Sequence, residues 1–271
     1  MLAMSFTNKA TKKNIIVIQP VGNTISSTTL SESARIISNR LKDFGIDKTE
    51  VTVIPENNQI KIIEVNDSDT IMAKKLITNQ GRIEFCKPYN IEDLRNLLKN
   101  DNRLFNLFNE ETVYDSDIKI GCIPLSKKEK INEYLNTTGN DKKCRYVWSN
   151  VSDSAEVCMY ALKSEFDKES LLTGNDLDSV KVNRNKSSKY WYIDFSFKKT
   201  AIKVWSDITK QNIGNSIAIV VDDHVICSPV INTIIESGKC SITGTFSEQE
   251  VKLFAAFGNY GELPVSFCVV K

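Results

Sequence analysis

The sequence contains a single histidine, and its seven cysteines include no C-x-x-C pair. Zinc sites are usually built from clustered cysteines and histidines, so we expect no metal site. His224 stands beside Asp222 and Asp223 between two apolar runs, where a solvated turn is a better interpretation than a catalytic base or a cation site. No glycine cluster precedes a helical pattern as in a phosphate-binding loop. The sequence therefore predicts no catalytic residue and no cofactor site, and we do not expect an enzyme.

An excess of charge and long apolar runs are also missing. The chain has 35 Lys and Arg against 34 Asp and Glu, without an arginine-rich or lysine-rich run, so no nucleic-acid partner is expected. No apolar run approaches the roughly 20 residues of a membrane helix, and the N-terminus has no signal-peptide stretch. We therefore expect either a cytoplasmic protein or a piece cut free of its signal or anchor.

Most of the cysteines lie in apolar, strand-like stretches such as RIEFC at 82–86 and SFCVV at 266–270. A free cysteine behaves as a small hydrophobic residue. The odd number weakly opposes a disulfide framework, and with it an oxidising compartment. We expect buried, reduced thiols.

The first part of the chain alternates between strand and helix patterns. A helix that ends at Gly45 is predicted by five apolar residues spaced three and four apart: Leu30, Ala34, Ile37, Leu41 and Phe44. The neighbouring stretches predict strands at 14–19, 50–54, 59–65 and 82–86 and a second helix at 68–79. The order β-α-β-β-α-β is the ferredoxin-like arrangement.

The middle of the chain predicts a mixture of short helices and strands. Helices are expected at 90–99, 101–109 and 126–135, the last with Ser126 and Glu129 as a capping box. A strand is expected at 118–123, and a hairpin at 145–149 and 156–162.

The last third combines strands with two amphipathic helices. Strands are expected at 180–182, 190–197 and 261–271, and a helix at 198–212 with one apolar stripe. Apolar runs at 217–221, 225–235 and 240–242 predict a β-meander whose first turn is 222–224. Ser247 and Glu250 form a capping box for a second helix. Strands and helices in this order predict an α+β fold.

Three stretches closely resemble the first periplasmic domain of SecD, a membrane component of protein export. They are NIGNSIAIVVDDHVICSPVIN at 212–232, SITGTFSEQEVKLFAA at 241–256 and ELPVSFCVV at 262–270. LTGNDL at 172–177 matches the family's L-T-G-x-D-L. The residues that stand at the family's pattern positions are Asn212, Gly214, Ala218, Asp222, Val225, Pro229, Asn232, Thr243, Gly244, Phe246 and Pro264.

The resemblance extends to the N-terminal part. Residues 33–62 are similar to the SecD stretch in which a helix with R-x-x-x-x-G-V precedes a hairpin, and GRIEF at 81–85 looks like its A-x-L-E-F strand. The chain departs from the family at 63–67, where it reads IEVND and SecD continues into L-P-G. KINEYLN, RYVWS and MYALKS in the middle are similar to the longer SecD variety that is fused to SecF.

The resemblance implies an α+β domain in which a head is inserted into a ferredoxin-like base. The base comprises residues 13–88 plus 262–271, the insertion or connector 89–170 and the head 171–261. It also implies an extracytoplasmic, periplasmic location, membrane-associated if the chain is a fragment. The implied partners are unfolded secretory polypeptides, the SecYEG channel and SecF-type subunits. The proton-carrying aspartates of the family lie in membrane helices, so this stretch alone is not expected to couple transport to a proton gradient.

Two surfaces are candidates for binding polypeptide. One is the largely apolar segment Ser228, Pro229, Val230, Ile231 and Asn232, whose proline suits an edge strand or a bulge rather than a central strand. Such an edge can receive an extended peptide, or the proline can protect it from pairing.

The second surface contains Tyr190 and Tyr192, which flank Trp191 in the densest aromatic cluster of the chain. This cluster is either a platform for polypeptide or an ordinary cross-strand aromatic pair.

A free-standing interaction or sensor module with the same fold is the alternative function.

Overall fold

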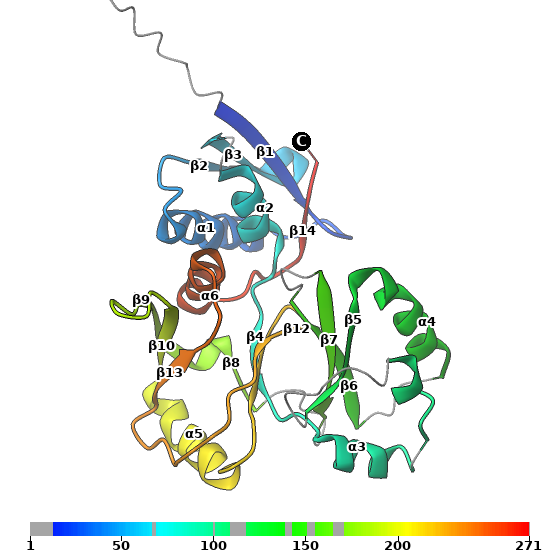
Figure 1. Ribbon diagram of the computed structural model, residues 1–271. Helices are drawn as coiled ribbons and strands as arrows, with labels where there is room; N and C mark the ends of the chain where they lie inside the picture. The colour runs from blue at the N-terminus through cyan, green and yellow to red at the C-terminus, as the bar shows by residue number, and fades with distance from the viewer. Residues whose placement is uncertain are drawn as a thin grey trace, which may run out of the picture. The chain divides into compact units, whose positions relative to one another are not determined.

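A computed structural model describes residues 13–66, 69–99, 101–108, 118–138, 143–150, 155–164 and 171–270 (Figure 1). The chain divides into two compact units. Unit 1 comprises residues up to Gly81 and from Lys252 onward, and unit 2 comprises Arg82–Val251. Both combine helices with β-sheet, so the predicted α+β class is confirmed. Within the described ranges, no helix combines the length and the hydropathy of a membrane span.

Unit 1 contains a four-stranded antiparallel sheet in the order β14-β1-β3-β2, accompanied by α1 and α2. Its elements are β1 (Lys13–Pro20), α1 (Ser27–Phe44), β2 (Glu50–Ile54), β3 (Gln59–Asn66), α2 (Thr70–Thr78) and β14 (Phe267–Val269). The strands and helices predicted up to residue 79 are present to within three residues, although Ser68, the predicted start of the second helix, lies outside the described residues.

The sequence of α1 explains both its ends and its buried face. The Ser26 hydroxyl accepts a hydrogen bond from the backbone N–H of Thr29, as expected of an N-cap. Gly45 ends the helix in the left-handed conformation, with φ of 103°. Leu30, Ile37 and Leu41 are fully buried, as the periodicity predicts.

The strand predicted to complete the first unit does not do so. β4 (Ile83–Cys86) lies in the large sheet of unit 2, between β11 and β8, and β14 takes the place beside β1. All four residues of β4 are buried, which suits a central strand covered on both faces better than the edge of a small sheet. The order β14-β1-β3-β2 is compatible with a ferredoxin-like arrangement in which the last strand comes from the C-terminal segment.

Arg40, a charged residue of α1, is fully buried in the middle of unit 1. Its guanidinium donates hydrogen bonds to the carbonyl oxygen of Leu76 in α2 and to those of Asn79 and Gln80 directly after this helix. It also donates to the carbonyl oxygen of Gly261. The carbonyls at the C-terminal end of α2 carry the negative end of its dipole, and all four supply the acceptors that a buried cation requires.

A ring and a glycine complete the surroundings of this guanidinium. It lies 4.7 Å from the centroid of the Phe257 ring. A Cβ atom at Gly81, whose φ is +74°, would stand 2.4 Å from Nη2 of Arg40. Only glycine therefore fits at this position.

We expect Arg40→Leu to lower the free energy of unfolding of unit 1 by about 3 kcal/mol or more, because several buried carbonyls lose their donor. Arg40→Lys restores the charge but not the fork of donors, and is expected to recover only part of the loss. All three tryptophans lie in unit 2, so tryptophan fluorescence would not report on unit 1. Urea unfolding is therefore followed by far-UV circular dichroism.

The matched control is Arg35→Leu on the same helix, where an exposed arginine pairs with Glu32. Equal losses of stability in Arg35→Leu and Arg40→Leu would contradict a special role for the buried guanidinium.

Unit 2 contains two sheets. The seven-stranded sheet has the order β5-β7-β6-β12-β11-β4-β8, and the three-stranded sheet has the order β13-β10-β9. The strands are β5 (Lys119–Pro124), β6 (Cys144–Ser149), β7 (Glu156–Lys163), β8 (Leu172–Thr173), β9 (Leu177–Arg184), β10 (Trp191–Phe197), β11 (Ala218–Val221), β12 (His224–Cys227) and β13 (Lys239–Thr243). The helices are α3 (Ile91–Leu97), α4 (Lys128–Thr138), α5 (Lys199–Gln211) and α6 (Glu248–Tyr260), the last of which continues into unit 1.

The core of unit 2 has two parts. Phe85 of β4, Phe195 and Phe197 of β10 and Trp205 of α5 form one aromatic cluster, with ring centroids 4.8–5.7 Å apart. This cluster joins the two sheets to α5. In the other part, residues of β5, β6 and β7 pack with α3 and α4, and the buried residues include Leu94, Ile120, Ile131, Trp148 and Met159.

The hairpin predicted around residues 222–224 is confirmed, but the meander is wrong. Asp222 and Asp223 both have positive φ, at 46° and 63°, as in the two-residue turn that matches strand twist. β12 then ends at Cys227 and pairs in parallel with β6, whereas β13 pairs with β10. The intervening segment leaves the sheet because Pro229 cannot donate a ladder hydrogen bond.

Two helix predictions in the connector also change. The helix predicted at 101–109 is reduced to a single 3-10 turn at Phe105–Leu107, and Asn109 lies outside the described residues. The helix predicted from Ser126 begins at Lys128 after a 3-10 turn at Leu125–Lys127. The capping box of α6 is confirmed, since the Ser247 hydroxyl accepts from the Glu250 N–H and the Glu250 carboxylate accepts from the Ser247 N–H.

Candidate functional site

The predicted segment Ser228–Asn232 borders an apolar groove of about 230 Å³ in unit 2. Val230 is 52% exposed at its rim, whereas the side chain of Ile231 is buried. The lining comes from α5, β10, β11 and β13 and the segments beside them, and includes Phe195, Trp205, Ile217, Ile219, Pro229, Val230, Ile231, Asn232, Thr233, Ile235, Cys240 and Ile242. The surface is therefore a groove with a hydrophobic floor.

The backbone of this segment is already paired on one side. The Pro229 carbonyl accepts from the N–H of Ile217, and the Ile231 N–H and carbonyl bond to Asn215 and Gly214. The segment is thus held against 213–217 by isolated bridges and is not a regular edge strand as predicted. The true edge strand beside the groove is β13, which lies at one end of the three-stranded sheet.

A polar group lies in the floor of the groove. Trp205 is 3% exposed, and its indole N–H has no nitrogen or oxygen acceptor among the described residues. The thiol of Cys240 is the weaker acceptor beside it.

Tyr190 and Tyr192 line a separate groove of about 280 Å³, together with Trp191, Thr243 and Gly244. Tyr190 is 62% exposed. The Arg184 guanidinium lies 5.3 Å from the centroid of the Trp191 ring, so this ring has a neighbour on one face. The structure does not bring the two predicted surfaces into one cavity, but both border β13, the first at Cys240–Ile242 and the second at Thr243.

A charged cluster holds the β11–β12 turn in place. Glu84 is almost fully buried and lies 3.1 Å from Arg145 and 3.6 Å from Arg82. Arg82 also pairs with the Asp223 carboxylate at 3.0 Å, and its backbone N–H donates to Asp222. These two aspartates therefore have a structural role in the turn.

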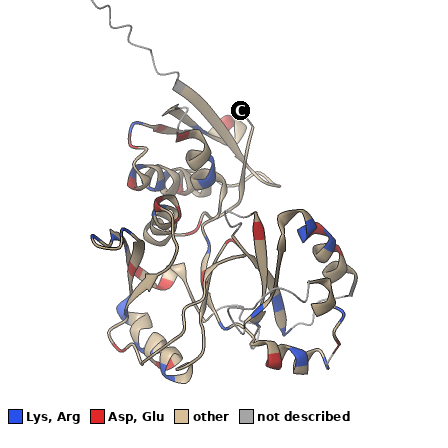
Figure 2. Cartoon of the chain, viewed as in Figure 1, with Lys and Arg blue, Asp and Glu red and all other residues tan. Residues whose placement is uncertain are grey.

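Elsewhere acidic and basic residues are interspersed over the elements of both units (Figure 2), in keeping with the net charge of +1. Among the described residues there is no group of three or more metal-ligating side chains of the usual kinds.

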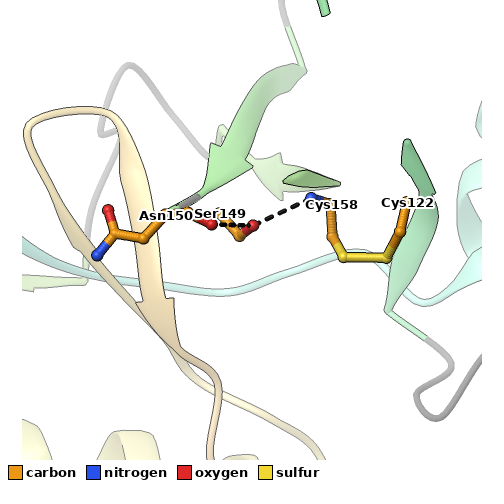
Figure 3. Close-up of a disulfide and its surroundings, with 4 residues drawn as sticks. All are labelled: Cys122, Ser149, Asn150 and Cys158. Carbon is orange, nitrogen blue, oxygen red and sulfur yellow. Dashed lines mark hydrogen bonds between the residues drawn. A yellow bond between two sulfur atoms is a disulfide. The ribbon is translucent and has the colours of Figure 1, made fainter. Parts of the chain in front are cut away.

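Two cysteines form a disulfide, so the expectation of reduced thiols throughout is wrong for this pair. Cys122 of β5 and Cys158 of β7 are joined, with Cα atoms 4.0 Å apart (Figure 3). They are directly opposite each other in an antiparallel ladder, where side chains approach closely. Because this proximity depends on strand register across 36 residues, spacing in the sequence did not show it.

The five remaining cysteines are not part of a disulfide. They are Cys86, Cys144, Cys227, Cys240 and Cys268. Burial raises the pKa of Cys227 and Cys240 to about 12, because a thiolate in the apolar interior would lose its hydration.

We expect five thiols to react with a maleimide when the protein is unfolded in urea without reductant, and seven after reduction. The Cys122→Ser/Cys158→Ser double variant should lose about 3 kcal/mol of stability relative to the oxidised parent, in line with native disulfides. Reductant should remove this difference. Seven reactive thiols in the untreated protein would contradict the pairing.

The raised thiol pKa values also predict a loss of stability at high pH. The unfolded thiol ionises near its ordinary pKa of 9.0, whereas the folded thiol of Cys240 stays protonated up to about pH 12. The stability contributed by the neutral thiol is therefore complete below pH 9 and is lost as the pH rises toward 12. The Cys240→Val variant should show a flatter fall in urea midpoint between pH 8 and 10.5, and an unchanged slope would be evidence against this burial.

Comparisons with known proteins agree with this fold. Residues 154–265 match the family model of the SecDF P1 head subdomain. The protein translocase subunit SecD of Endomicrobium trichonymphae is 29% identical over 244 residues, which cover 89% of this chain and 46% of that protein. SecD of Calditerrivibrio nitroreducens is 26% identical over 248 residues, which cover 91% of this chain and 41% of the relative. The chain thus spans less than half the length of these curated relatives.

Solved structures give the same result for the fold. A structure described as that of a membrane component SecDF that enhances protein export has a TM-score of 0.57 at 20% identity, with 95% of this chain and 98% of the other covered. SecDF in its super-membrane-facing form also has a TM-score of 0.57, with 29% of that chain covered. The resemblance seen in the sequence is confirmed: residues 154–265 match the SecDF P1 head subdomain model, and the chain is similar along most of its length to SecD proteins.

Proposed function

We propose that this chain serves protein export as a SecD-type extracytoplasmic domain that holds unfolded polypeptide without catalysing a reaction. The observation that carries the proposal is the apolar groove beside Val230. A dry cavity of about 150 Å³ is large enough to bind benzene. The groove, at about 230 Å³, therefore has room for one large apolar side chain.

Strand addition to β13 gives such a polypeptide a way to bind without sequence specificity. β13 is at the edge of its sheet, so an extended chain can pair with its backbone while side chains enter the neighbouring grooves. Backbone pairing is common to all sequences, which suits a domain that meets many different polypeptides. Ser228–Asn232 and the two tyrosines, Tyr190 and Tyr192, then supply side-chain contacts at two places along one strand.

The Cys122–Cys158 disulfide supports an extracytoplasmic location, since disulfides persist in oxidising compartments such as the periplasm. Relatives named as protein translocase subunits support the Sec translocon as the partner. The SecYEG channel and SecF-type subunits are proposed from the resemblance seen in the sequence. In this role the domain acts beside the channel on polypeptide that has not yet folded.

The test is the affinity of the purified chain for an unfolded, signal-bearing secretory protein, compared with the same protein folded. We expect binding in the micromolar range to the unfolded form only. Val230→Asp places a charge at the rim of the apolar groove and should weaken binding about tenfold, or about 1.4 kcal/mol. Tyr190→Ser tests the second groove in the same assay.

The matched control is Val21→Asp, at a similarly exposed valine of unit 1. Equal binding of the folded and unfolded forms would overturn the proposal and favour an interaction or sensor module. Equal effects of Val21→Asp and Val230→Asp would remove the groove from the site.

A further inference from the structure

A second, polar pocket of about 250 Å³ also has Val230 in its lining. Its other walls come from the segment after β4, from α3, from the end of β7 and from the segment after α5. The residues that bear on its chemistry are Lys87, Asp93, Lys163, Asn212 and Asn215. Val230 therefore lies between an apolar groove and a polar pocket of the same unit.

Asn212 places an unsatisfied acceptor in this pocket. The residue is 3% exposed, and its amide nitrogen donates to the Ile208 carbonyl at 2.7 Å, which fixes the orientation of the amide. Its carbonyl oxygen has no hydrogen-bond partner among the described residues. A buried acceptor of this kind favours a ligand that brings an N–H group.

The pocket also has a surplus positive charge. Lys163 lies 3.3 Å from the Asp93 carboxylate and over the Tyr89 ring, so its charge is compensated. The ammonium group of Lys87 has no ion-pair partner within the described ranges of the chain. One lysine without a counter-ion beside a buried acceptor is complementary to a carboxylate that stands next to a peptide N–H.

We propose that Val230 and the two pockets beside it select extended polypeptide segments in which an acidic side chain lies close to a large apolar one. The apolar side chain occupies the groove, the carboxylate pairs with Lys87, and a neighbouring backbone N–H donates to Asn212. Because Val230 lines both cavities, the two side chains lie close together along the extended segment. This inference rests on the proposed function and names the sequence class of its polypeptide.

The experiment uses acetylated and amidated fluorescent peptides, so that no terminal charge contributes. In each peptide an Asp stands one, two or three positions from a Phe, and the twin peptide carries Asn in its place. We expect the best Asp peptide to bind the native chain about tenfold more tightly than its Asn twin, with the preference shrinking as salt is added. Lys87→Glu should abolish the preference.

Lys203→Glu is the matched control, because it changes the net charge equally on the exposed face of α5. Equal affinity for the Asp and Asn peptides, or equal effects of Lys87→Glu and Lys203→Glu, would overturn the inference while leaving apolar peptide binding intact. A further peptide carries Asn and a free C-terminal carboxylate. If this peptide binds tightly and the amidated Asp peptides do not, the pocket recognises the C-terminus of a chain and the inference is overturned. Failure of every Phe-containing peptide to bind would instead refute the proposed function.

Discussion

The buried guanidinium of Arg40 is the interaction on which the architecture of unit 1 depends. It binds carbonyl oxygens at the end of α2 and, far along the sequence, the carbonyl of Gly261. The chain leaves unit 1 after Gly81 and returns to it at Lys252, so Arg40 joins the two separate stretches of which unit 1 is made. One side chain thereby lets a unit made of two separate stretches keep a single core, with Gly81 leaving the space that the guanidinium requires.

Unit 2 is held together by a cluster of aromatic rings and by a buried glutamate paired with arginines. The Phe85 cluster joins its two sheets, and Glu84 with Arg82 and Arg145 fixes the turn between β11 and β12. Both devices use neighbouring residues of β4, so this short strand links several elements of the unit. The grooves lie along β13 and the segment after β12, and Phe195 and Trp205 of the aromatic cluster line the apolar one.

Elements that depend on local chemistry could be predicted, and those that depend on distant partners could not. The apolar periodicity and Gly45 were enough to predict α1 and its end. Asp222 and Asp223 were enough to predict a tight turn. The partner of β4 was not predictable, because a short apolar strand has no periodicity that distinguishes one sheet from another.

The same limit applies to the candidate site. Val230 and its neighbours could be chosen as apolar residues beside a proline, but the groove is formed by residues from five separate stretches. Asn212 was visible only as a family pattern position, and the polar pocket that it lines also depends on Lys87, which no motif marks. Because β1 pairs with β14, Ile18 meets Val269 only when nearly the whole chain is available. During synthesis one edge of β1 therefore stays unpaired while unit 2 is made. The entropic cost of closing so long a loop is smaller once the intervening segment is compact. The edge of β1 that pairs with β14 is thus expected to be completed late, whereas its pairing with β3 can form early.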